Sequence, residues 1–408
     1  LLMPNGQFGT RLSGGKDSAS ERYIFTELNQ LTRIIYPDID DKVLKYLDDD
    51  GQMVEPIYYA PIIPMVLVNG SKGIGTGFST DVMCYNPVDI IGYLLNKLHD
   101  KDTSSTPLMP YYEGFKGTIS SMDAGKYLIR GVYEKVGNDS IRITELPIGT
   151  WTDDYKKFLE DLIDSKKTAS KKKSSTAGMV RDYTDMSTDK VVDITIQLAK
   201  GSIEILESET HEYGLNGIEK SFKLYTTNTT SNMHMFDAAE KLKLYKNVYE
   251  IMDDYFDTRM AVYVKRKQYI IDSLNAELVV LSNRAKYIQE NLDETIDLRR
   301  KKKDEIITLL KSKNYDIVDE DEDYKYLVKM PMDSVSEENV AKIMKSHEDK
   351  MTELELCITT TESQMWITEL GTLNQKYNDY KSAREKNMCE KVTSSKIKSK
   401  PKKLKLKM

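Results

Sequence analysis

Apolar residues near the start of this chain recur at helical spacing. Between Tyr23 and Ile35 the apolar positions, among them Leu28 and Leu31, fall three or four residues apart more often than two. That period is typical of one face of an amphipathic helix, and Ser18 or Ser20 stands where a helix cap is favoured. The pattern predicts a short helix here.

The next apolar run has a different character. Residues 56–68 are rich in Ile and Val, which predicts a buried strand, although Pro61 and Pro64 interrupt it. A glycine-dense loop follows at 69–77 and has Ile74 at its tip. Residues 87–98 then predict a helix that begins near Asn86.

Residues 111–225 mostly alternate between apolar and polar side chains. The runs at 117–120, 127–133 and 141–144 predict a meander of strands, and the stretches 191–198 and 222–227 alternate again. Between them, residues 166–176 are a low-complexity run of Lys, Ser and Thr that predicts an exposed loop.

The last third of the chain returns to a helical period. From Leu274 to Ile296 apolar residues alternate between three- and four-residue spacing, which predicts a long helix with a coiled-coil seam. A second long helix is predicted over 337–386, and the polar segment between the two predicts a small knob at the end of an antiparallel arm. The tail from Lys391, with seven lysines in 396–407, is expected to be disordered.

Composition excludes several classes of protein but does not choose one. The chain has 408 residues, of which 39% are hydrophobic and 30% charged, and no apolar run is long enough to span a bilayer. The net charge of −6 hides an uneven distribution, with an acidic block at 319–323 and a basic tail, so it does not decide whether the chain binds DNA. Because the chain begins at Leu1 without a visible signal peptide, we expect it to be a piece of a longer protein.

Cysteine and histidine give no metal or disulfide pattern. The three cysteines (Cys84, Cys357 and Cys389) are far apart, and the four histidines lack ligand spacing, so we expect no metal site in this chain. Residues 9–16 resemble a phosphate-binding loop, but the spacing is one residue too long and Asp17 stands in place of Ser or Thr. Residues 73–77 echo a dinucleotide fingerprint whose third glycine is missing.

One constellation remains, around Tyr23. Among 26 tyrosines, composition alone would favour an ordinary core tyrosine at this position. However, the whole segment 6–26 closely resembles the active-site segment of eukaryotic-type type IIA DNA topoisomerases, and residues 61–77 and 323–331 match two further motifs of that family in the same order. The resemblance extends to about residue 391 and is thinnest between 151 and 217.

The resemblance assigns the chemistry to Tyr23 and Arg22. It implies that Tyr23 attacks a DNA phosphodiester and becomes linked to the 5′ phosphate, one tyrosine in each half of a homodimer. A free tyrosine hydroxyl has a pKa near ~10, so it needs help to become a phenolate at neutral pH. The cationic Arg22 is suited to stabilise the phenolate and the charge on the phosphoryl oxygens.

The resemblance also implies contacts with double-stranded DNA. The isoleucine that matches Ile74 wedges between base pairs and bends the duplex, although a buried hydrophobe beside glycines is an equal alternative. Asn69 and Lys72 are expected near phosphates, but the family often has an acidic residue at Lys72, which puts that contact in doubt. The expected DNA contacts also include Arg11, Lys16, Lys223 and Asn232. The stretch 223–232 could equally be a plain polar loop.

The expected architecture is α+β and multidomain. A winged-helix remnant with the active-site tyrosine is predicted over 1–55, a β-rich tower over 56–233, a coiled-coil arm with a C-terminal dimerisation gate over 234–390, and the basic tail over 391–408. The resemblance implies that Mg²⁺ is bound by a Toprim domain and ATP by an ATPase domain, both expected upstream of Leu1. We therefore expect this piece alone to bind DNA but to cleave it poorly.

Two broader questions stay open at this point. The alternative to an ATP-dependent topoisomerase is a non-enzymatic architectural protein that dimerises through its coiled coil and clamps DNA, and the long helices support both. The expected localisation is the nucleus, or cytoplasmic replication sites of a host cell if the source is a large DNA virus. The basic tail is either a nuclear signal or an extension with affinity for DNA.

Overall fold

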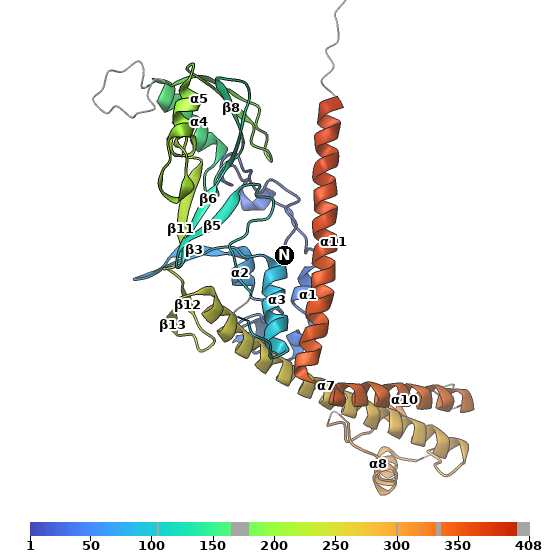
Figure 1. Cartoon of the computed structure of the whole chain (residues 1–408). Helices are drawn as coiled ribbons and strands as arrows, with labels where there is room; N and C mark the ends of the chain where they lie inside the picture. The colour runs from blue at the N-terminus through green and yellow to red at the C-terminus, as the bar shows by residue number, and fades with distance from the viewer. Residues whose placement is uncertain (104–105, 165–178, 299–300, 319, 332–335, 398–408) are drawn as a thin grey trace, which may run out of the picture. The chain divides into compact units, whose positions relative to one another are not determined.

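The computed structural model describes residues 1–103, 106–164, 179–298, 301–318, 320–331 and 336–397. The chain forms two compact units, each assembled from separate stretches of sequence (Figure 1). Unit 1 contains residues 1–35 and 63–256 and the described residues from Leu373 onward, and unit 2 contains residues 36–62 and 257–372. The predicted loop at 166–176 lies outside the described residues.

The helix predicted over 23–35 is wrong. A 3-10 turn, η1 (Glu21–Tyr23), is followed by extended backbone, and only α1 (Thr32–Ile35) is helical. The backbone of residues 26–29 pairs with the chain start instead: Met3 N donates to Glu27 O (2.9 Å) and Asn29 N donates to Leu1 O (2.8 Å). These bonds satisfy the same backbone groups that a helix would use, so tertiary pairing overrides the local apolar period.

The strand predicted over 56–68 is also wrong, and its predicted burial holds only from Ala60 onward, because residues 57–59 are exposed. Strand β2 (Gln52–Pro56) ends where the apolar run begins, and α2 (Met65–Asn69) follows Pro64. Proline cannot donate to a strand ladder but is tolerated at a helix start, which explains the change. The predicted glycine loop is a hairpin of β3 (Ser71–Ile74) and β4 (Ser79–Val82), and the predicted helix is confirmed as α3 (Pro87–Leu98), capped by Asn86.

The predicted strand meander of unit 1 is confirmed as two antiparallel sheets. One has the order β11-β6-β5 and the other the order β7-β8-β10-β9. Buried residues of the second sheet, such as Ile141, Ile143 and Ile196, form a core with three helices that the alternation did not predict. The elements are β5 (Thr118–Asp123), β6 (Lys126–Arg130), β7 (Val132–Lys135), β8 (Ser140–Glu145), α4 (Thr152–Asp164), β9 (Val180–Asp185), β10 (Ile194–Leu198), α5 (Ser202–Ser208), η3 (Glu212–Gly214), α6 (Gly217–Ser221) and β11 (Tyr225–Thr229).

A small hairpin precedes the long helix. Strands β12 (His234–Phe236) and β13 (Leu242–Leu244) pair antiparallel, and Phe236 lies directly opposite Leu242. Helix α7 (Val248–Leu292) then begins in unit 1 and continues into unit 2.

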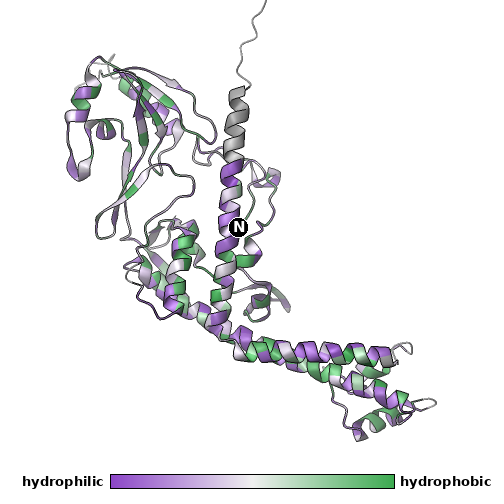
Figure 2. Cartoon of the chain, turned by 45° about the vertical axis from the view of Figure 1, so that its right-hand side comes forward, coloured by the Kyte–Doolittle hydropathy of each residue, from purple (hydrophilic) through white to green (hydrophobic). Residues whose placement is uncertain are grey.

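Unit 2 is built on two antiparallel helices, α7 and α10 (Glu337–Thr359), which lie side by side in Figure 1. Lys350 Nζ lies 3.2 Å from Glu277 Oε2, and Lys267 Nζ lies 3.6 Å from Glu362 Oε1 at the start of α11, so partners later in one helix lie earlier in the other. Along both helices hydrophilic and hydrophobic residues alternate (Figure 2). Of the predicted seam residues on α7, four are buried (Leu274, Leu278, Ala285 and Ile288), whereas Leu292 at the helix end is exposed.

The second long helix was predicted as one element but is two. Helix α10 ends at Thr359, and α11 (Glu362–Ile397) begins after a break at Thr360 and Thr361. Thr361 Oγ1 accepts from Gln364 N (3.2 Å) while Gln364 Oε1 accepts from Thr361 N (2.9 Å), which is a capping box. The helix continues to Ile397, so the first residues of the tail are helical rather than disordered. Residues 398–408 lie outside the described residues.

The remainder of unit 2 comprises the knob, a small compact element between α7 and α10, and the stretch 36–62. Buried residues including Tyr287, Leu310 and Tyr324 form the small core of the knob, which confirms a compact element between the long helices. Its helices are α8 (Lys303–Ser312) and α9 (Lys325–Val328). The stretch 36–62 carries η2 (Asp38–Lys42) and a hairpin of β1 (Tyr46–Asp49) with β2.

Unit 2 also holds a buried ion cluster. The Asp40 carboxylate accepts from Arg259 Nη1 (2.7 Å) and from Arg266 Nε and Nη2 (both 2.7 Å). Glu369 Oε1 accepts from Arg266 Nη1 (2.5 Å), so η2, α7 and α11 are joined through charged groups. Among the described residues, no helix combines the length and the apolar character that crossing a membrane requires.

Candidate nucleophile and nucleic-acid interface

The Tyr23 side chain is exposed to solvent. It closes the η1 turn, where Tyr23 N donates to Ser20 O (2.9 Å), and 67% of the residue is exposed. The Arg22 guanidinium carbon lies 5.7 Å from the centre of the Tyr23 ring. An exposed phenol beside a permanent cation can reach an external anion, such as a phosphodiester, while the cation stabilises negative charge.

The loop before Tyr23 is fastened at both ends. Thr10 N and Thr10 Oγ1 donate to the two oxygens of Asp17 (2.8 and 2.6 Å), and Ala19 N donates to Gln7 O (2.9 Å). The Thr10 hydroxyl and amide lower the pKa of Asp17 below its ordinary value, so this bond is intact at neutral pH. The turn that presents Tyr23 is therefore a defined structure.

The same loop also contacts the end of β8, the start of α4 and Trp151 between them. Arg11 forms an ion pair with Glu145, whose side chain is only 1% exposed, and Ser13 Oγ donates to Asp153 Oδ2 (2.6 Å). The Ser13 hydroxyl and Lys156 lower the pKa of Asp153. Gly14 has φ +62°, and a Cβ there would lie 2.4 Å from the Trp151 ring. The loop thus packs on Trp151 where only glycine fits.

We expect Gly14→Ala to displace this loop. The added methyl group meets the Trp151 indole, so the loop should leave the ring, and the Trp151 fluorescence should shift to the red with faster proteolysis between residues 9 and 17. Gly15→Ala is the matched control, because Gly15 has φ +83° but an added Cβ would meet no atom within 4 Å. Equal effects of the two variants would show that backbone strain at positive φ, and not a clash with Trp151, displaces the loop.

Ile74 stands at the tip of the β3–β4 hairpin and is 95% exposed. Gly75 N donates to Phe78 O (2.8 Å) and closes the turn, while Gly73 and Gly77 leave open space where a Cβ would stand. Single exposed apolar side chains are common on protein surfaces, so the feature that distinguishes Ile74 is its position at a projecting tip. The buried alternative for Ile74 is therefore wrong.

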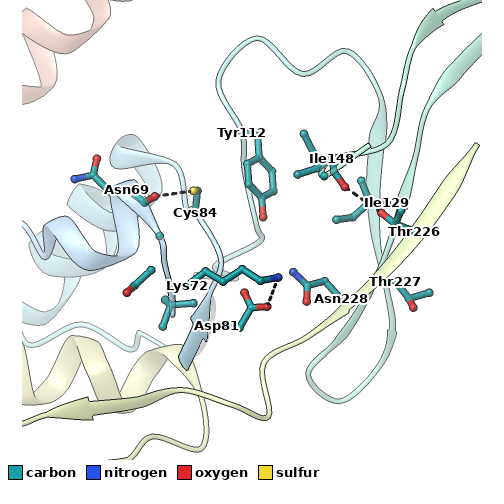
Figure 3. A pocket seen from close by; sticks show the side chains of 14 residues that line it. Asn69, Lys72, Asp81, Cys84, Tyr112, Ile129, Ile148, Thr226, Thr227 and Asn228 are labelled. Atoms are coloured by element: carbon teal, nitrogen blue, oxygen red, sulfur yellow. Dashed lines mark hydrogen bonds and ion pairs between the residues drawn. The ribbon is translucent and has the colours of Figure 1, made fainter. Parts of the chain in front are cut away.

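A pocket of about 410 Å³ lies beside this hairpin (Figure 3). Its walls include Asn69, Lys72, Asp81, Tyr112 and Asn228, and Lys72 points toward Asn228 in Figure 3. Lys72 Nζ also pairs with Asp81 Oδ2 across the hairpin at 3.0 Å, although 80% of its side chain is exposed. Burial raises the pKa of Tyr112 to about 12, so its hydroxyl stays neutral in the pocket. This arrangement offers one cation and several neutral hydrogen-bonding groups.

The remaining predicted contact residues divide into two groups. Lys16 is exposed, and exposed Lys223 places its ammonium 4.3 Å from the Phe158 ring centre. Arg11 and Asn232 instead have internal partners: Arg11 pairs with Glu145, and Asn232 Nδ2 donates to Ser79 Oγ (2.7 Å). The structure brings Asn69, Lys72 and Asn228 to one pocket, whereas Arg11 and Asn232 are committed to holding other elements.

A family model that describes the A subunit of DNA gyrase/topoisomerase IV matches residues 1–371. The chain belongs to this family. It is 36% identical over 442 residues to DNA topoisomerase 2 of Arabidopsis thaliana, which covers 98% of this chain and 29% of that protein. It is 32% identical over 439 residues to human DNA topoisomerase 2-beta, which covers 100% of this chain and 26% of that protein.

The fold agrees with a solved structure. The crystal structure of the Plasmodium falciparum topoisomerase II DNA-binding, cleavage and re-ligation domain matches with a TM-score of 0.82 at 34% identity, over 95% of this chain and 54% of that chain. This member of the gyrase/topoisomerase IV family therefore has the mixed α/β fold of that domain, and it spans less than two thirds of each of these three proteins.

The sequence of this family member did not reveal the residues that position the Tyr23 loop and the Ile74 turn. Glu145, Trp151 and Asp153 fasten the Tyr23 loop, and Phe78 backs the turn behind Ile74. No local pattern could identify Glu145, which lies 134 residues from Arg11. Gly14-Gly15 was a usable signal, because adjacent glycines often mark a close approach of backbone to a large side chain.

Proposed function

We propose that this chain carries the DNA-cleaving tyrosine of a type IIA DNA topoisomerase, and that Tyr23 is its nucleophile. The observation that carries the proposal is a largely exposed Tyr23 beside the Arg22 guanidinium, in a chain of the gyrase/topoisomerase IV family. Transient double-strand cleavage, strand passage and religation follow from this assignment.

The chemistry that we propose conserves bond energy. The Tyr23 hydroxyl loses its proton and its oxygen attacks phosphorus to form a 5′-phosphotyrosyl ester. The bond from phosphorus to the 3′ oxygen breaks, and the 3′ oxygen takes up a proton, so no proton is gained or lost overall. Arg22 stabilises the negative charge on the phosphoryl oxygens in the transition state. Because one phosphodiester replaces another, the 3′ hydroxyl can reverse the reaction without a high-energy cofactor, whereas attack by water would lose that reversibility.

We propose that the residues that bind Mg²⁺ and ATP lie outside the described residues of this chain. Among those residues, no group of three or more His, Cys, Asp or Glu side chains could hold a metal ion. We propose that the Mg²⁺ and ATP of the complete cycle are held by the Toprim and ATPase domains that the resemblance implies.

We propose that Ile74 is the wedge that bends the cleaved duplex. Apolar side chains inserted between base steps partly unstack them and kink the duplex. Lys72, Asn69, Lys16 and Lys223 are proposed to contact nearby phosphates, because their side chains lie on exposed surface or along the pocket. Arg11 and Asn232 are proposed to act indirectly, through the elements that they hold.

Ile74→Ala should reduce both bending and cleavage while leaving the fold intact. Since Ile74 is 95% exposed, its truncation removes almost no packing, so the unfolding temperature should stay within about 1 °C. We expect a roughly tenfold fall in the bent fraction, as measured by energy transfer between dyes at the ends of a duplex, because unstacking a step costs a few kcal/mol that the wedge no longer offsets. Unchanged bending would contradict the wedge.

The proposed architecture follows the same resemblance. We propose that segment 1–55 is part of a winged-helix domain, that the sheets of unit 1 form the tower, and that α7 with α10 form a coiled-coil arm whose knob is the C-terminal gate of a homodimer. Its localisation is proposed to be nuclear, or at host replication sites for a viral source.

Relaxation of supercoiled plasmid tests the function against the architectural alternative. The full-length protein with Mg²⁺ and ATP should change linking number in steps of two, because both strands are cut. A coiled-coil clamp that only binds DNA would leave linking number unchanged after deproteinisation. Absence of ATP-dependent relaxation by the full-length protein would contradict the proposed function.

A further inference from the structure

We propose that Phe78, Phe236 and the Asn232–His234 segment act as positioning residues that hold Ile74 rigid for insertion into DNA. The inference rests on the proposed function of Ile74, and it assigns these residues no contact with DNA. We call this set the hairpin brace, and all of it lies in unit 1.

The brace begins directly behind the tip. Gly75 N donates to Phe78 O (2.8 Å), and a Cβ on Gly75 would lie 2.7 Å from the Phe78 ring. The ring therefore lies against the turn at a distance that only glycine permits. Movement of Phe78 would be transmitted to Ile74 through this turn.

The Phe78 ring is held in turn by β12. Its centroid lies 6.0 Å from that of Phe236 with the rings at 88°, an edge-to-face contact, and 6.3 Å from that of His234. Phe236 is itself 62% exposed, so it contributes little to any core. Its ring instead supports one aromatic side chain next to the wedge, in the geometry that aromatic pairs favour.

Hydrogen bonds fix the second strand of the hairpin to the same segment. Asp81 N donates to Asn232 O (2.7 Å), and Asn232 Nδ2 donates to Ser79 Oγ (2.7 Å). His234 Nδ1 lies 3.1 Å from both Ser79 O and Asn232 Oδ1. Since both of those oxygens accept, Nδ1 carries the proton.

A brace of this kind is needed for physical reasons. A two-stranded hairpin is marginally stable in isolation, and inserting a side chain into a base stack meets resistance from the duplex. An unsupported hairpin would bend away before the DNA did. The ring contacts on one face of the hairpin and the hydrogen bonds along β4 connect it to β12 and to the buried Met233 beside it, so these residues resist bending of the hairpin.

The test is a double-mutant cycle on DNA bending, measured by energy transfer with the full-length protein. Phe236→Ala should lower the bent-to-unbent ratio about two- to tenfold at saturating protein, the range expected for loss of an aromatic pair, and Phe236→Tyr should restore it. In the Ile74→Ala background, Phe236→Ala should have no further effect, because the brace acts through Ile74. Ile205→Ala, which removes an equally accessible apolar side chain from α5, should leave bending unchanged.

Two outcomes would overturn the brace directly, and a third would transfer the test to a second variant. Unchanged bending in Phe236→Ala while Ile74→Ala loses it refutes the brace and leaves the wedge intact. A full additional loss in the double variant means that Phe236 contacts DNA itself. A lowered unfolding temperature in Phe236→Ala assigns its effect to folding, and Asn232→Ala, which removes the bond to Ser79, must then reproduce the bending loss at wild-type stability or the brace is rejected. Unchanged bending in Ile74→Ala instead refutes the proposed wedge.

Discussion

Tyr23→Phe should abolish covalent protein–DNA adducts and lower plasmid relaxation by at least about a thousandfold, the scale on which enzymes lose turnover without their nucleophile. The change removes one oxygen from a ring that is 67% exposed, so packing and DNA affinity should be unaffected. Adducts trapped in denaturant and relaxation of supercoiled plasmid measure the two losses, and gel shift measures DNA affinity.

Tyr58→Phe is the matched control for this prediction. Tyr58 is 46% exposed, belongs to unit 2 and has no proposed role, so the loss of its hydroxyl should change neither adducts nor relaxation. Adducts that persist at wild-type level in Tyr23→Phe would remove this residue from the chemistry, even if every other feature of the proposal stood.

Asp40→Ala should destabilise unit 2 by about 3–5 kcal/mol, the cost of removing one partner from a buried ion pair. The side chains of Arg259 and Arg266 are 0% and 3% exposed, and the change takes from them the carboxylate that both contact at 2.7 Å. A guanidinium keeps its proton in proteins, so neither arginine can lose its charge when the Asp40 carboxylate is removed. Thermal unfolding followed by circular dichroism should show a transition lower by roughly 6–20 °C.

An exposed ion pair in the same unit provides the control. Lys303 Nζ lies 2.6 Å from Asp323 Oδ2 with 68% of the lysine side chain exposed, and Lys303→Ala should leave the unfolding temperature nearly unchanged, because exposed ion pairs contribute little to stability. A shift for Asp40→Ala as small as that of Lys303→Ala would mean that water or other groups compensate the arginines, and the cluster would lose its structural role.

Elements with a long, consistent period were predictable from the sequence. The helix α7 and the helix at 87–98 are both predicted by the sequence, because a repeated apolar spacing over many residues has few alternative interpretations. The exposed Ile74 was placed correctly at a tip because glycines surround it. The family resemblance, not the local pattern, singled out Tyr23.

The errors occurred where tertiary contacts or single capping residues decide the backbone. Residues 24–29 have a helical apolar period but pair with the chain start, and no property of the local sequence reveals that partner. The break between α10 and α11 did have a signal, since Thr361 and Gln364 have the spacing of a capping box. The roles of Arg11 and Asn232 could not be inferred, because a basic or amide side chain near a DNA site can bind DNA or hold a loop, and only its partners distinguish the two.

The central claim is that DNA becomes bonded to Tyr23, and peptide mapping of the trapped adduct tests it most directly. Trypsin cleaves after Arg22 and Arg33, and the peptide 23–33 contains a single tyrosine. After cleavage complexes are trapped in denaturant and digested with trypsin and nuclease, mass spectrometry should find this peptide carrying a nucleotide through its 5′ phosphate. A nucleotide on any other peptide, or complexes that yield no modified peptide, would contradict the account.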